Sequence, residues 1–285
     1  MSTFLPEIWH YFLKVSAATT SQLLLAFMPL LILTFLMHYL SLLNERLNYK
    51  VLGKNLYLYL FGWMGTSVHE MGHALFAILF GHKIKEMKLF KPNSENGTLG
   101  YVTHTYNPKN LYHQVGNFFI GIGPVLMCTL VLLLMCRIFY HINFFNSSGI
   151  HLSSGTFASF SEIKKLMQDI WKEILFFVYA CFKGELAAWW KTVIFLYLFY
   201  SIGSSITLSP SDLKLSFKGF LIIVILLFLF NAATLWIAGF NHEWFTGIQN
   251  FMSGFYPVMI LAVTVTLFFT GLLALYQFIR YLLHK

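Results

Sequence analysis

Residues 55–80 read NLYLYLFGWMGTSVHEMGHALFAILF, and the only charged side chain in this stretch is that of Glu70. As a helix the stretch is long enough to cross about 30 Å of hydrocarbon, which takes roughly 20 residues. His69 and His73 lie four positions apart and therefore on one helix face, so both imidazoles can bind one tetrahedral metal ion. The stretch thus predicts a membrane helix that carries the zinc-hydrolase pattern H-E-x-x-H, with Glu70 beside the open metal position.

The composition of the whole chain also indicates a membrane protein. Of its 285 residues, 58% are hydrophobic and only 11% are charged, and the mean hydropathy is +0.67. Such a chain belongs in a bilayer. We therefore predict an all-α polytopic membrane protein with about six transmembrane helices, forming one membrane-embedded domain over residues 1–285. The predicted spans are residues 22–43, 55–80, 114–136, 191–208, 220–240 and 251–279.

Two segments between the spans have a different character. Residues 83–106 contain two β-like runs separated by Asn96-Gly97, which predicts a small β-hairpin directly after the metal-binding helix. Such a hairpin either offers an edge on which an extended peptide can pair, or caps the bundle as a solvent-exposed ribbon. Residues 157–183 alternate apolar and charged side chains at helical spacing, which predicts an amphipathic helix on the membrane or on the bundle.

The formal net charge of +8 does not indicate a nucleic-acid partner. The Lys and Arg residues are confined to loops and helix ends, where anionic lipid headgroups account for them. They are divided almost equally between the two sides of the predicted bundle, so the positive-inside rule assigns no orientation. We expect the bilayer, and no nucleic acid, as a partner of this chain.

A catalytic zinc ion normally has three protein ligands and one open position, so a third ligand is needed beside the two histidines. Asp212 is the better placed of the two aspartates, because Asp169 falls on the amphipathic segment. Asp212 also fits a structural role: Ser209, Pro210 and Asp212 resemble a capping box that opens the next helix. The ligand and cap roles are compatible with each other. His242 and Glu243 are reserve candidates.

A glutamate in the middle of a membrane span costs on the order of 2.5 kcal/mol or more, so such groups usually serve a function. Beside zinc, Glu70 can act as the general base that takes a proton from a metal-bound water, whose pKa falls to about 7. The alternative is a polar cluster that interhelical hydrogen bonds satisfy. The small residues near Glu70 let neighbouring helices approach closely under either interpretation.

The segment 67–74, SVHEMGHA, followed by Gly81, resembles the metal-binding helix of the site-2 protease family of intramembrane zinc metalloproteases. The hairpin after this helix follows the family's usual order, and residues 116–124, GNFFIGIGP, resemble the start of the family's next span. In the family a later helix supplies an aspartate as the third zinc ligand, a role that the resemblance implies for Asp212. The family's pattern there contains an Asn before the Pro and a Gly after the Asp, and residues 205–213 lack both.

The resemblance implies an enzyme that hydrolyses peptide bonds of membrane-embedded proteins or peptides. His69, His73 and Asp212 would hold Zn²⁺, and Glu70 would be the catalytic base. No regulatory insertion is visible, so the chain is similar to a minimal membrane core of a divergent branch. Its compact size and its lack of eukaryotic targeting features favour a bacterial cytoplasmic membrane.

Two other classes of protein compete with this interpretation. A membrane zinc peptidase of the prenyl-protein-processing type usually takes its third ligand from a later Glu, for which Glu185 and Glu243 are available. A non-catalytic zinc-binding partner of other membrane proteins is the second alternative. A solute carrier is disfavoured, because no repeated halves or paired broken helices are evident in the sequence.

Overall fold

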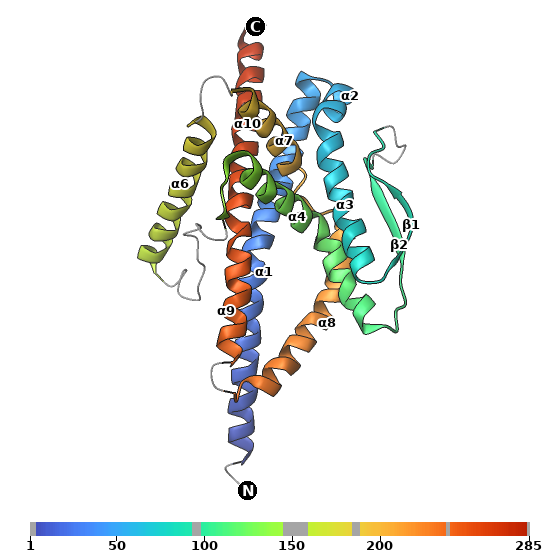
Figure 1. Cartoon of the computed structure of the whole chain (residues 1–285), viewed down its shortest axis with the longest axis vertical. Coiled ribbons are helices and arrows are strands. Elements are labelled where there is room, and N and C mark those ends of the chain that lie inside the picture. The colour runs from blue at the N-terminus through green and yellow to red at the C-terminus, as the bar shows by residue number, and fades with distance from the viewer. Residues whose placement is uncertain (1–3, 93–97, 145–158, 184–188, 238–239, 284–285) are drawn as a thin grey trace.

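The structure, a computed structural model, describes residues 4–92, 98–144, 159–183, 189–237 and 240–283. It confirms the predicted helical fold with a small antiparallel hairpin (Figure 1). The helical elements are α1 (Phe4–Val51), α2 (Lys54–Tyr57), the π-helical turn η1 (Leu58–Gly62), α3 (Trp63–Leu79), α4 (Leu111–Tyr140), α6 (Phe160–Phe182), α7 (Trp189–Gly203), α8 (Pro210–Thr234), α9 (Phe240–Ser253) and α10 (Phe255–Leu283). The strands are β1 (Lys83–Lys88) and β2 (Tyr101–Thr105).

Four helical stretches among the described residues are long and apolar enough to cross a membrane: Pro6–Val51, Leu111–Tyr140, Pro210–Thr234 and Trp244–Leu283. They contain or overlap the predicted spans 22–43, 114–136, 220–240 and 251–279. The predicted span 55–80 corresponds to the consecutive elements α2, η1 and α3, and the predicted span 191–208 to α7, which has only 15 residues. The count of about six spans is therefore not confirmed.

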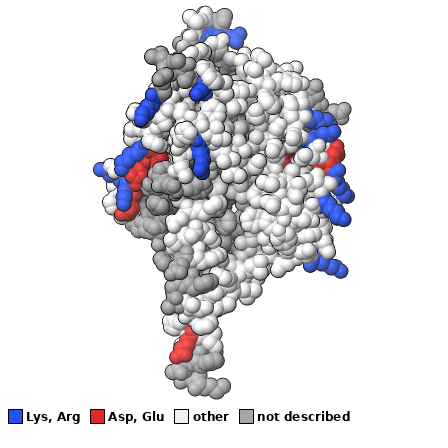
Figure 2. Space-filling view, in the orientation of Figure 1, with Lys and Arg blue, Asp and Glu red and all other residues white. Residues whose placement is uncertain are grey.

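The outward-facing side chains of the long helices are apolar. On α1, Leu24, Ile32 and Leu36 each expose about half of their surface, and α8 and α10 carry similar rows. Figure 2 shows a broad uncharged surface over the middle of the molecule, with Lys and Arg gathered over α6 at one side and the hairpin at the other. An exposed apolar surface of this extent is typical of contact with lipid. The chain is an integral membrane protein.

Helix α4 lies at the centre of the bundle and packs most extensively against α3 and α8. Glycines make these contacts close. A Cβ atom on Gly72 of α3 would lie 2.6 Å from the carbonyl oxygen of Gly123, and one on Gly121 would lie 2.6 Å from that of Asp212. The backbones of α3 and α8 therefore touch α4 directly, as small residues allow in membrane bundles. This packing brings the start of α8 to the middle of α3.

The hairpin lies beside α3 (Figure 1). Helix α3 ends at Leu79, and Gly81, with a φ of 71°, follows it before β1 begins. The strands of the hairpin pair in antiparallel register from Lys83 opposite Thr105 to Lys88 opposite Tyr101, with a bulge near Ile84. The predicted hairpin is thus confirmed, and its predicted turn, Asn96-Gly97, lies outside the described residues. The predicted amphipathic segment forms α6, which buries Phe177 and Cys181 and lies near α10 (Figure 1).

Candidate metal centre

Helix α3 presents two histidines whose Nδ1 atoms are already engaged. His69 Nδ1 lies 3.0 Å from the carbonyl oxygen of Ser205, and His73 Nδ1 lies 2.8 Å from that of Ile120. A carbonyl only accepts hydrogen bonds, so each Nδ1 carries the proton and each Nε2 keeps a free lone pair. Hydrogen bonds of this kind are typical of histidines that bind metals, because they fix the tautomer and the ring orientation.

Asp212 approaches the two histidines from the first turn of α8. One carboxylate oxygen, Oδ2, accepts a hydrogen bond from the backbone N–H of Ser209 at 2.8 Å, and the Ser209 hydroxyl accepts one from the N–H of Asp212 at 3.2 Å. These two bonds form the capping box that the sequence predicts. The other oxygen, Oδ1, lies 3.3 Å from His73 Nε2. The carboxylate therefore caps the helix with one oxygen and faces the histidines with the other.

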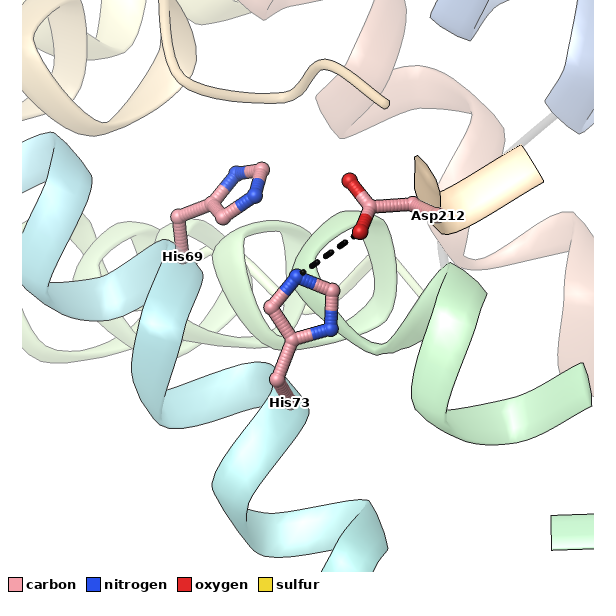
Figure 3. Close-up of side chains that lie close together, drawn as sticks. All are labelled: His69, His73 and Asp212. Atoms are coloured by element: carbon pink, nitrogen blue, oxygen red, sulfur yellow. Dashed lines mark ion pairs between the residues drawn. The ribbon is translucent and has the colours of Figure 1, made fainter. Parts of the chain in front are cut away.

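His69, His73 and Asp212 together offer three ligand atoms within 4.8 Å of one another. Figure 3 shows the three side chains converging, the two imidazoles from α3 and the carboxylate from α8 on the other side. Two imidazole nitrogens and one carboxylate oxygen form a donor set typical of catalytic zinc, which leaves a fourth position for water or substrate. The side chains of His73 and Asp212 are only 11% and 13% exposed, so a carboxylate placed there without a cation would be costly. The residues present fit a zinc ion.

Glu70 lies next to this group and is 8% exposed. The hairpin covers it: a Cβ atom on Gly100 would lie only 2.7 Å from Glu70 Cγ and 2.9 Å from the carbonyl oxygen of Leu89. Glu70 nevertheless lines the same cavity as the three candidate ligands. A carboxylate in this place could exchange a proton with a reacting group beside the three candidate ligands, while the hairpin holds it against α3.

The cavity has a volume of about 810 Å³ and extends well beyond the candidate metal centre. Its walls come from α1, α2, α3, the hairpin, the segment that joins α7 to α8, the start of α8 and one residue of α4. Other ionisable residues that line it were not predicted as site residues from the sequence, among them His38 and Glu45 on α1, and His104 on β2. No ligand spacing links them to the H-E-x-x-H motif. Only the packing of the bundle, in which α1 contacts α10, α8 and α2 and the hairpin contacts α3, brings them there.

His104 is held by a second histidine. His82 Nε2 lies 2.9 Å from the carbonyl oxygen of His113, and His82 Nδ1 lies 3.0 Å from His104 Nδ1. Burial and the neighbouring His82 lower the pKa of His104 to about 4, and burial likewise lowers the pKa of His82. Both rings are therefore neutral at pH 7, and a single proton between the two Nδ1 atoms can form their hydrogen bond. The pair fastens β2 to the end of α3.

The other residues weighed as metal ligands are not found at this centre. Asp169 forms an ion pair with Lys172 on α6 at 3.0 Å. His242 and Glu243 belong to α9, but their side chains lie outside the described part of the chain, as does Glu185.

The fold and this centre define a class of protein, an integral membrane protein with a group of two histidines and one aspartate that could bind a metal ion. Within that class, residues 32–140 match the family model described as Peptidase M50B-like, which confirms over this segment the resemblance to the site-2 protease family. The family indicates a metallopeptidase, and the matched segment includes His69, Glu70, His73 and the hairpin, whereas Asp212 lies beyond it. Comparisons with curated proteins and with solved structures give no significant match.

Proposed function

We propose that the chain is an intramembrane zinc metalloprotease that hydrolyses peptide bonds of membrane-embedded proteins or peptides. The observation that carries this proposal is the convergence of His69, His73 and Asp212 beside Glu70, in a cavity within an apolar helical bundle. Residues 1–285 form its single membrane-embedded domain in this proposal, and a bacterial cytoplasmic membrane is its setting.

In this proposal His69, His73 and Asp212 would hold zinc, which when bound would supply a Lewis acid for the substrate carbonyl and for water. Glu70 accepts the proton of the attacking water and passes it to the departing amine. The carbonyl groups of Ser205 and Ile120 keep the two imidazoles in the tautomer that this requires. The hairpin excludes bulk water from Glu70 on one side.

A helical substrate must unwind locally before cleavage, because its carbonyl groups are occupied by internal hydrogen bonds. Residues 98–102 and His104, on and before β2, line the cavity, and among the described strands β2 pairs only with β1. An unwound segment that pairs with the remaining edge of β2 would replace its lost backbone hydrogen bonds. This supports the docking role of the hairpin over that of a passive cap.

Metal removal tests the proposal directly. Protein reconstituted in vesicles is incubated with fluorescently labelled peptides that each contain one apolar membrane span, and the products are identified by mass spectrometry. We expect cleavage within or next to the span, its loss after treatment with a chelator, and its return when zinc is added back. Cleavage that survives complete removal of metal would overturn the proposal.

Gly100 provides a second test, because any side chain at this position meets Glu70. We expect Gly100→Ala to lower the cleavage rate by up to about 100-fold, since small displacements of catalytic groups have costs of that order, with zinc content unchanged. Rates and metal content are measured on the same preparations. Gly271→Ala on α10, where a Cβ atom meets nothing within 4 Å, is the matched control and should retain full activity. Equal rates for both variants would contradict the role given to the contact with Gly100.

A further inference from the structure

The longest helix, α1, presents a row of polar side chains to the cavity. His38, Ser41, Glu45 and Tyr49 follow one another at intervals of three or four residues and all line the cavity. Side chains at this spacing share one face of a helix. The outer face of the same helix carries exposed apolar residues. The polar row therefore lines the cavity along α1, a helix that carries none of the residues assigned a catalytic or ligand role.

Glu45 is the one acidic side chain of this row, and only part of the hydrogen-bonding capacity of its carboxylate is used. The Tyr49 hydroxyl donates a hydrogen bond to Glu45 Oε1. In the part of the chain that the structure describes, no Lys, Arg or His nitrogen lies within 4.0 Å of its carboxylate. A carboxylate has room for about four hydrogen bonds. Glu45 is half-buried in the polar end of α1, beyond the predicted span 22–43, and its carboxylate lines the cavity.

We infer that Glu45 is a specificity-determining residue, which binds the side chain of a Lys or Arg in the flank of the substrate's membrane span. This inference rests on the proposed function and names the substrate class. Membrane spans commonly carry Lys or Arg next to their ends, and these long side chains reach polar sites while their stems stay in apolar surroundings. The metal centre and the row on α1 share one cavity. When the unwound segment of a substrate span reaches the metal centre, one flank of that span would therefore lie along α1.

The charges around Glu45 support a cation rather than an anion as its occupant. Lys54 of α2 also lines the cavity, but its side chain is exposed and forms no ion pair with Glu45. An exposed ammonium is well solvated and contributes little to binding, whereas a half-buried carboxylate interacts through a lower effective dielectric constant. Arg46 and Lys50 follow Glu45 in α1 but do not line the cavity. Lys54 is thus a matched control for Glu45.

The test measures binding and cleavage with one set of peptides, acetylated at the N-terminus so that their only variable cation is a side chain. The peptides share one membrane span and carry Lys, Gln or Glu in the flank, moved one residue at a time along each end. The dissociation constant is measured with full-length protein in nanodiscs. At the best flank position we expect wild type to bind the Lys peptide about tenfold more tightly than the Gln peptide, equivalent to about 1.4 kcal/mol.

The variants distinguish a charge contact from a structural role. Glu45→Gln should remove the preference for Lys, Glu45→Lys should reverse it toward the Glu peptide, and Lys54→Gln should leave it unchanged. Binding of the Gln peptide should be the same in all four proteins, which also shows that the variants fold. Equal binding of Lys and Gln peptides at every position by wild type would overturn the inference. If that preference is present but no peptide is cleaved, the proposed function fails and the inferred contact stands.

Discussion

Replacement of Glu70 by glutamine is expected to lower the cleavage rate by a factor of about 10² to 10⁴, the range that a general base contributes, while zinc stays bound. Glutamine has nearly the same shape as glutamate, so it fits beneath Gly100, but it cannot accept and return a proton at neutral pH. The metal ligands in our proposal are His69, His73 and Asp212, and none of them is changed. The rate is measured with the labelled span peptides and the zinc content by elemental mass spectrometry.

Glu162→Gln is the matched control, because Glu162 is an exposed glutamate in the first turn of α6 and does not line the cavity. It should cleave at the wild-type rate. A Glu70→Gln protein that retains both zinc and full activity would remove Glu70 from the role of base. One that loses zinc would show that Glu70 supports metal binding, which the proposed mechanism does not require. An inactive, zinc-loaded Glu70→Gln protein would also serve as a trap for natural substrates.

The part of the site that lies on one helix could be predicted from the sequence alone. His69 and His73 are four residues apart, and the geometry of a helix places them on one face whatever surrounds it. The hairpin could be predicted for a similar reason, since its strands are neighbours in the chain. The capping box at Ser209 and Asp212 is equally local, and the structure forms it as the residue pattern indicates.

The cavity beyond the metal centre could not be predicted, because it depends on which helices pack together. Glu45 and His38 belong to α1, and His104 reaches the cavity through the pairing of β2 with β1. One wall of the cavity did have a pattern in the sequence. An acidic side chain with a serine and a histidine on the same face of an apolar helix, as on α1, indicates an interior polar surface.

Replacement of Asp212 is expected to have the second large effect on zinc binding and cleavage. Its two carboxylate oxygens have different partners. Oδ2 caps α8 and Oδ1 faces His73. Asparagine at position 212 keeps a side-chain oxygen that can accept the hydrogen bond from the N–H of Ser209, but it lacks the negative charge that a zinc ligand supplies. Changes beyond the ligands themselves already cost about 10- to 100-fold in metal affinity. We expect Asp212→Asn to lower zinc affinity by at least about 100-fold and to abolish cleavage.

Ser209→Ala separates the cap from the ligand. It removes the hydroxyl that accepts the N–H of Asp212, and loss of such a cap costs about 1 kcal/mol of stability, but it leaves the carboxylate in place. Zinc affinity, from competition with a chelator, and thermal unfolding of the metal-free proteins are measured for both variants. We expect Ser209→Ala to unfold at a lower temperature and keep its zinc, and Asp212→Asn to show the larger loss of zinc with the smaller loss of stability.

The opposite pattern would make Asp212 a helix cap alone. If Asp212→Asn kept its zinc while His73→Ala lost it, the third ligand would have to come from another helix, with His242 and Glu243 as the first candidates to replace by alanine. The position of Asp212 argues against that outcome. The capping box fixes the carboxylate on the first turn of α8, and the close contact at Gly121 fixes that turn against α4. Since α4 also holds His73 through the carbonyl of Ile120, one helix sets the separation of both groups.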